Sequence, residues 1–125
     1  MKDYKNLDTS KLNYIIYCRR SSEEGEDKQV QSLETQLREL TEHAKKNNLK
    51  IVDIISESKS AFKVGREGFD KMMNLIRTGK ADALLVIRAN RISRNPIDAG
   101  YVISLMDEER LLYIRTPNST CYTSS

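Results

Sequence analysis

The sequence predicts a three-layer α/β fold, in which a mostly parallel central sheet of about four strands carries helices on both faces. Short β-branched and aromatic runs alternate along the chain with stretches in which apolar residues recur at helical spacing. One run, at 83–87, is apolar throughout, as expected for a central strand that is covered on both faces. Because the connections are short, this alternation implies parallel strands joined by right-handed crossovers.

Four strands and three helices follow from these patterns. The strands are predicted at 12–18, 51–55, 83–87 and 111–114. The first helix is predicted at 32–47, and the inward faces of the three helices are Leu33, Leu37, Leu40 and Ala44, then Phe69, Met72, Met73 and Ile76, then Val102, Leu105 and Met106. Gly79 is placed to end the second helix in the left-handed conformation. The third helix begins with Asn95 as N-cap, Pro96 in the first turn and Asp98 near the positive end of the helix dipole.

Length and composition predict a single domain. A chain of 125 residues with 38% hydrophobic and 31% charged residues is typical of one globular unit. We expect a polar leader at 1–11, the domain at 12–117 and a tail at 118–125 that leads into a larger protein. No apolar run approaches the roughly 20 residues of a membrane span, and the N-terminus has no signal-peptide core. We therefore expect a cytoplasmic protein with no membrane partner.

Basic and hydroxyl side chains follow three of the predicted strands. The carboxyl ends of parallel strands share one edge of a sheet, and ligands bind beyond that edge. The side chains concerned are Arg19, Arg20, Ser21 and Ser22 after the first strand, Ser58, Lys59, Ser60, Lys63 and Arg66 after the second, and Arg88, Asn90, Arg91, Ser93 and Arg94 after the third. Guanidinium groups bind pairs of phosphate oxygens, and an arginine beside a serine favours the alkoxide. The sequence thus predicts a phosphate site at this edge, the alternative being solvated loops with structural ion pairs.

Other kinds of site have little support. The sole histidine, His43, lies in a polar stretch of the first predicted helix, so we interpret it as a surface residue rather than the base of a Ser-His-Asp triad. The acidic stretch at 23–27 lacks the spacing of an EF-hand. Cys18 and Cys121 lack the spacing of a zinc site, and no disulfide is expected. No glycine-rich phosphate loop follows the first strand. We therefore expect no metal and no cofactor.

Four motifs resemble those of one enzyme family. Residues 17–21 (YCRRS) resemble the strand-end Tyr-x-Arg-x-Ser motif of the serine recombinases, the resolvase and invertase superfamily. Residues 31–36 (QSLETQ) resemble the Gln-Ser-Leu-x-x-Gln start of the first helix in that family. Residues 57–61 (ESKSA) with 66–69 (REGF) are similar to its second motif, and residues 90–95 (NRISRN) resemble its Asp-Arg-Leu-x-Arg-Asn motif. The matches occur in the family's order and cover most of the chain.

The resemblance implies a resolvase-like fold and the N-terminal catalytic domain of a DNA strand-transfer enzyme. Ser21 would attack a DNA phosphodiester to form a 5′-phosphoserine link and a free 3′-hydroxyl. Strands could then be exchanged and religated without ATP or metal. The residues implied to bind or position the phosphate are Arg19, Arg66, Arg91, Arg94, Ser60 and Gln36, with further substrate contacts expected from Asn90, Arg20, Lys63 and Arg88. The implied partners are DNA and further copies of the protein, as dimers and tetramers.

The sequence departs from the family pattern at two places. Asn90 stands where the family has an aspartate, and an amide cannot titrate. The interval between Ser21 and Gln36 is longer than in small resolvases, which is more similar to the large serine recombinases of phages and mobile elements. In those proteins a DNA-reading region follows the catalytic domain.

Three alternatives stay open from the residues. Ser22 is a rival nucleophile, although Arg19 and Ser21 are expected to point to the same side of an extended strand end. The chain could be a non-catalytic module that binds phosphate or nucleic acid with the same basic edge. A flavodoxin-like or receiver-like domain would need an acidic pocket or a flavin-binding loop where this sequence has arginines.

Overall fold

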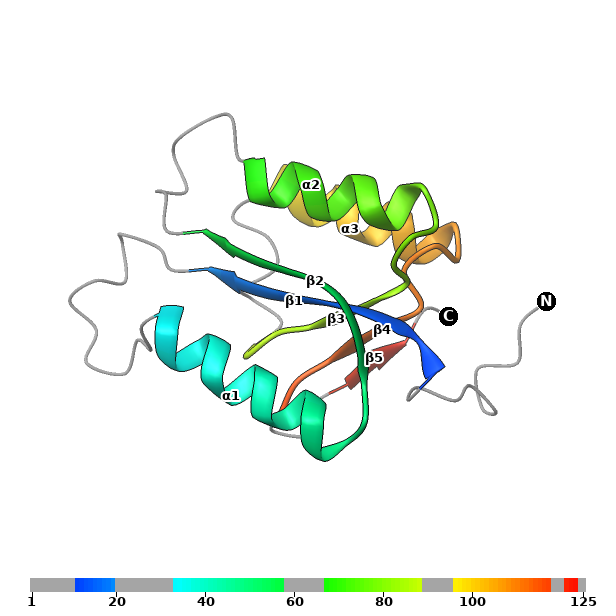
Figure 1. Cartoon of the computed structure of the whole chain (residues 1–125). Helices are drawn as coiled ribbons and strands as arrows, with labels where there is room; N and C mark the ends of the chain where they lie inside the picture. Colours follow the sequence, from blue (N-terminus) through cyan, green and yellow to red (C-terminus); the bar gives the residue numbers. More distant parts are fainter. Residues whose placement is uncertain (1–10, 20–32, 58–66, 89–95, 118–120, 124–125) are drawn as a thin grey trace.

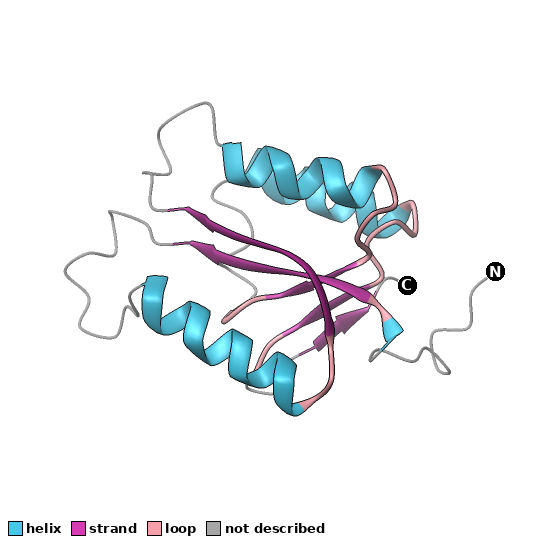
Figure 2. Cartoon of the chain, viewed as in Figure 1, coloured by secondary structure: helices cyan, strands magenta, loops and turns pink. Residues whose placement is uncertain are grey.

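The computed structural model describes residues 11–19, 33–57, 67–88, 96–117 and 121–123. The elements, in chain order, are β1 (Asn13–Arg19), α1 (Leu33–Lys46), β2 (Lys50–Glu57), α2 (Glu67–Arg77), β3 (Ala83–Leu85), α3 (Pro96–Asp107), β4 (Tyr113–Arg115) and β5 (Cys121–Thr123). Helix α1 covers one face of the sheet, and α2 and α3 cover the other (Figures 1 and 2). The predicted three-layer α/β class is therefore confirmed. Within the described segments, no helix has the length and apolar character needed to cross a membrane.

One five-stranded sheet, of order β2-β1-β3-β4-β5, forms the middle layer. β1 pairs in parallel with both β2 and β3, and β3 pairs in parallel with β4. These four strands are the predicted ones, although β3 ends at Leu85 and β4 begins at Tyr113, so both are shorter than expected. β5 pairs antiparallel with β4. It lies within 118–125, a segment in which the sequence pattern indicates no strand.

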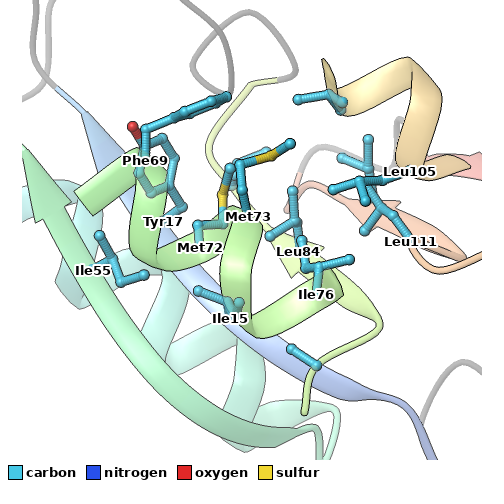
Figure 3. Close-up of a cluster of buried hydrophobic side chains, with 14 residues drawn as sticks. Ile15, Tyr17, Ile55, Phe69, Met72, Met73, Ile76, Leu84, Leu105 and Leu111 are labelled. Atoms are coloured by element: carbon cyan, nitrogen blue, oxygen red, sulfur yellow. The ribbon is translucent and has the colours of Figure 1, made fainter. Parts of the chain in front are cut away.

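The central strands are covered on both faces because their alternating side chains enter two apolar clusters. The cluster under α2 and α3 consists of Ile15, Tyr17, Ile55, Phe69, Met72, Met73, Ile76, Ala81, Leu84, Val86, Val102, Leu105, Leu111 and Ile114 (Figure 3). The cluster under α1 consists of Leu12, Tyr14, Ile16, Cys18, Leu40, Ala44, Leu49, Ala83, Leu85, Ile87 and Leu112, with Leu33 and Leu37 packed against it. The predicted inward faces of the helices, and the two-sided burial of 83–87, are confirmed.

An extra residue interrupts the side-chain alternation of the edge strand β2. Tyr14 of β1 is in register with Ile51, but the next residue, Ile15, is in register with Asp53, so the pairing skips Val52. Such a β-bulge shifts the alternation of the bulged strand by one residue. As a result, Ile51 packs against the cluster under α1, whereas Ile55 belongs to the cluster under α2 and α3.

The helices end at residues in the left-handed conformation. Gly79 follows α2 with a φ of 82°, and its N–H donates to the carbonyl of Ile76 at 3.1 Å. This confirms the helix end predicted there, since a glycine adopts such a φ without steric cost. Asn48 after α1 and Glu109 after α3 have φ values of 56° and 60°.

Candidate active site

The sheet order brings the carboxyl ends of β1, β2 and β3 to one edge. β1 lies between the other two strands and is parallel to both (Figure 1). The helix that follows β1 covers one face, whereas the helix that follows β3 covers the other. At such a switch point between neighbouring strands, open parallel sheets bind their ligands. The edge on which the arginines and serines were predicted to gather is thus the edge that the topology provides for a ligand.

Three of the predicted site residues lie in the described segments, namely Arg19, Gln36 and Arg88. The others lie outside the described residues. They are Arg20, Ser21, Ser60, Lys63, Arg66, Asn90, Arg91 and Arg94, together with the rival nucleophile Ser22. The strands that lead to these residues are nevertheless described, so the edge from which each segment departs is known.

Arg19 is the last residue of β1, and only 4% of its surface is exposed. By strand alternation it shares the face of Ile15 and Tyr17, which is the face under α2 and α3. A guanidinium stays charged at any physiological pH, and its attraction for an anion strengthens when water is excluded. Arg19 is therefore a shielded cation at the edge where the phosphate is expected.

Gln36 connects the first turns of α1 to the end of β1. The residue is 1% exposed, and its Nε2 donates a hydrogen bond of 3.3 Å to the main-chain carbonyl oxygen of Arg19. This contact acts on the backbone directly before residues 20 and 21. Gln36 was implied to position the phosphate or the attacking hydroxyl, and that role stays a prediction. The contact that the structure describes holds the strand end.

Arg88 differs from Arg19 in its surroundings. It follows β3 after two buried residues, Val86 and Ile87, and its own side chain is exposed. The N–H of Val86 donates to the carbonyl of Arg115 at 3.0 Å, so the strand pairing continues one residue beyond Leu85. Arg88 is thus a solvated cation on the chain that leaves β3, where a ligand can reach it without any core residue moving.

His43 has a partner that the sequence pattern did not indicate. The residue is half-buried rather than fully solvated, and its Nε2 accepts a hydrogen bond of 2.9 Å from Nε of Arg115 at the end of β4. Burial, with the nearby charges of Arg115 and Lys46, lowers the pKa of His43. Since Nε2 can accept this bond only in the neutral imidazole, the geometry and the pKa agree. This hydrogen bond links α1 to β4, and His43 is not one of the predicted site residues.

Cys18 is the other nucleophilic side chain close to the end of β1. It is fully buried, and this burial raises the pKa of its thiol to about 11, despite an opposing hydrogen bond with the side chain of Ser56. At neutral pH the group is a protonated thiol, which is a poor nucleophile. Cys18 is therefore a core residue and does not compete with a serine at this edge.

The described surface also has two open grooves. One, of about 500 Å³, lies between α1 and β2 and is lined by Ile16, Thr41, Ala44, Lys45, Asn48, Leu49, Ile51 and Ile54. The other, of about 540 Å³, lies between α2 and α3 and is lined by Phe69, Asp70, Met73, Asn74, Arg77 and Tyr101. Neither lining includes Arg19, Gln36 or Arg88. In the described part of the chain, no group of three or more His, Cys, Asp or Glu side chains is placed to hold a metal ion.

Comparison with protein families gives one match that covers most of the chain. The family model described as the resolvase N-terminal domain matches residues 14–124. This range includes all four motifs on which the resemblance to serine recombinases rests, and it extends through β5.

Solved structures of serine recombinases have the same fold. The C-terminal catalytic domain of ISC1926 TnpA, an IS607-like serine recombinase, is 25% identical, with a TM-score of 0.64 over 84% of this chain and 69% of that one. A resolvase family site-specific recombinase from Streptococcus pneumoniae is 25% identical, with a TM-score of 0.62 over 86% of this chain and 73% of that one. The N-terminal catalytic domain of TP901-1 integrase is 23% identical, with a TM-score of 0.66 over 85% and 77%, and shows the fold alone.

Proposed function

The chain belongs to the resolvase N-terminal domain family of serine recombinases, and we propose that it cleaves and rejoins DNA through a covalent link to Ser21. The Oγ of Ser21 attacks the phosphorus of a phosphodiester while the bond from phosphorus to the 3′-oxygen breaks. The products are a 5′-phosphoserine and a free 3′-hydroxyl. Attack of a 3′-hydroxyl on the phosphoserine reverses the step, so rejoining needs no ATP.

The observation that carries this proposal is the position of Arg19. A buried arginine ends the strand that leads directly into Ser21, and the carbonyl of the same residue is held by Gln36. Groups that are fixed before the reaction stabilise a developing charge without the cost of reorganisation. A cation and an anchored main chain next to a serine suit attack on a phosphate better than they suit passive ion pairing.

The remaining site residues are proposed to complete the phosphate site from the next two strand exits. In the sequence, Arg66 follows β2, and Arg91 and Arg94 follow β3. Strands β2 and β3 are the two neighbours of β1 in the sheet. Their guanidinium groups would bind the non-bridging oxygens, and Ser60 would help to position the phosphate. Arg20, Lys63, Arg88 and Asn90 would contact the flanking backbone. Because such contacts are ionic, DNA binding is expected to weaken steeply with salt.

We further propose DNA as the substrate and a tetramer of the whole protein as the active assembly. The sequence predicts a catalytic domain at 12–117, and we propose that the domain also includes β5 (Cys121–Thr123), because that strand pairs with β4 in the same sheet. We expect a larger protein to supply the base-reading contacts. Phosphate contacts orient a protein on DNA but carry no sequence information. Residues 1–125 alone should therefore bind DNA weakly and without sequence preference.

The test is to trap the covalent intermediate on a suicide substrate. DNA that carries a nick near the cleavage site loses the short 3′-hydroxyl strand after attack, so the protein stays attached. Wild-type protein and Ser22→Ala should both form the adduct, and peptide mass spectrometry should locate the phosphate on Ser21. Ser21→Ala should form none, because the attacking oxygen is missing.

Two other results would change the conclusion. An adduct with Ser21→Ala but not with Ser22→Ala would transfer the nucleophile to Ser22. Salt-sensitive DNA binding without any adduct, under conditions that trap a related recombinase, would instead favour the non-catalytic phosphate-binding module.

A further inference from the structure

Asp98 is a buried carboxylate in the first turn of α3. It is the third residue of the helix and is 0% exposed. Val102 and Leu105, four and seven residues further on, are buried in the cluster under α2 and α3, so Asp98 lies on the stripe of α3 that faces the sheet. Among the residues whose burial the structure describes, it is the only buried carboxylate. An ionised carboxylate in such a place needs compensation by charge or hydrogen bonds.

Arg19 is the buried cation on the same face and at the same edge. Their neighbours along the chain place both residues in one layer, because Tyr17, two residues before Arg19, and Val102, four residues after Asp98, belong to the apolar cluster between the sheet and α2 and α3. From Tyr17, two residues of strand lead about 7 Å toward the carboxyl edge to Arg19. From Val102, four residues of helix lead about 6 Å toward the start of α3 to Asp98. The start of α3 and the end of β1 lie at the same edge, so both steps run in one direction (Figure 1).

We propose that Asp98 is a positioning residue that orients the guanidinium of Arg19 toward the phosphate. This rests on the function proposed above, because the orientation matters only if a phosphate is bound there. The carboxylate is held by a rigid helix and the arginine by the last residue of a central strand, so the pair fixes the direction of the charge before DNA arrives.

The first test measures coupling between the two side chains without reference to activity. Asp98→Asn, Arg19→Gln and the double variant are compared by thermal unfolding. If the residues are paired, the second substitution costs little once the first is made, and the double variant should melt close to the less stable single variant. Melting losses that simply add would overturn the proposal. Asp107→Asn, the same change at the exposed last residue of α3, is the matched control and should leave the melting temperature nearly unchanged.

A rival carboxylate is tested in the same way. Glu57 is in register with Arg19 on the neighbouring strand β2. The same comparison of melting losses is made for Glu57→Gln, Arg19→Gln and their double variant. If Glu57 couples to Arg19 and Asp98 does not, Glu57 of β2 is the partner of Arg19 and the proposal is overturned. If Asp98→Asn does not fold, the contact between Asp98 and Arg19 is tested by NMR on the wild-type protein. A nuclear Overhauser contact between the Arg19 guanidinium protons and the Asp98 β-protons is expected, and its absence counts against the pair.

The second test separates positioning from mere folding. At a temperature where Asp98→Asn is fully folded, the rate of serine–DNA adduct formation should fall by about tenfold or more, while DNA affinity changes by less than about threefold. A lower melting temperature with an unchanged adduct rate would show that Asp98 only stabilises α3. If wild-type protein forms no adduct at all, the proposed function fails, whereas the unfolding cycle still judges the Asp98–Arg19 pair.

Discussion

Helix α1 and the helix pair α2 and α3 cover opposite faces of the sheet through different kinds of contact. Under α2 and α3 the contact is dominated by apolar side chains such as Phe69 and Met72, and the ion pair from Lys71 to Asp53, at 3.1 Å, lies at the edge strand. α1 adds two hydrogen bonds to its apolar contact, from Gln36 to Arg19 and from Arg115 to His43. Apolar burial tolerates small shifts, whereas a hydrogen bond weakens steeply with distance and angle. The larger apolar cluster lies under α2 and α3, whereas the hydrogen bonds of α1 hold the carboxyl ends of β1 and β4.

The largest effect is expected from a cavity under α2 and α3. Phe69→Ala removes a ring that is 2% exposed and should lower the free energy of unfolding by about 3–5 kcal/mol. Urea unfolding followed by circular dichroism measures this loss. Ile97→Ala on α3 is the control, because Ile97 is 71% exposed and should change stability by less than about 0.5 kcal/mol. Equal losses for the two variants would contradict the burial of Phe69 in the cluster under α2 and α3.

A smaller loss of stability but a larger loss of activity is expected under α1. Gln36→Leu keeps the approximate volume and removes the donor to the Arg19 carbonyl, which should cost about 1–3 kcal/mol. The rate of adduct formation on suicide DNA should fall further than the loss of folded protein explains, because the chain before Ser21 is released. Arg38→Ala, two residues along α1 and exposed, is the control. If the loss of activity equals the loss of folded protein, then Gln36 stabilises the fold but does not position the chain before Ser21.

The smallest effect is a pH dependence of stability through His43. Its pKa in the folded protein is lowered, so the unfolded chain takes up the proton first. The contribution of His43 to the free energy of unfolding is therefore complete above about pH 6.5, the ordinary pKa of histidine. This contribution is lost as the pH falls through the lowered pKa that His43 has in the folded protein. Urea midpoints measured between pH 7 and pH 5 should fall more for the wild type than for His43→Gln. Identical slopes for the two proteins would contradict the lowered pKa of His43 in the folded protein.

Most elements of the fold could be predicted because their signals are local. The stripe of Leu40 and Ala44, the all-apolar run at 83–87 and the glycine at position 79 each follow from spacing over a few residues. The order of the strands could not be predicted, since crossover rules give handedness but not which strands become neighbours. β5 was missed because three residues carry no periodicity, and its pairing with β4 is a tertiary contact.

The candidate site, like the fold, could be predicted from the sequence only in part. The residue types that suit a phosphate, and the edge to which they belong, follow from motif position and strand direction. The burial of Arg19, the bond from Gln36 to its carbonyl and the burial of Asp98 depend on how helices lie on the sheet. His43 was interpreted as a surface residue because it lies in a polar stretch, and its partner, Arg115, is 72 positions away in the chain. Contacts of that separation leave no pattern in a single sequence.

The residue skipped at position 52 decides which way the second half of β2 faces. Beyond it, Asp53 reaches Lys71 of α2, Ile55 enters the core beneath that helix, and residue 57 comes into register with Arg19. If β2 paired regularly with Val52 in place, Val52 would lie opposite Ile15, and Asp53 and Ile55 would turn to the opposite surface of the sheet. Deleting Val52 would instead remove the bulge and leave Asp53 opposite Ile15, so both side chains would keep their present faces. The bulge thus lets β2 hold one extra residue without changing the register of the strand that leads to Ser60 and Arg66.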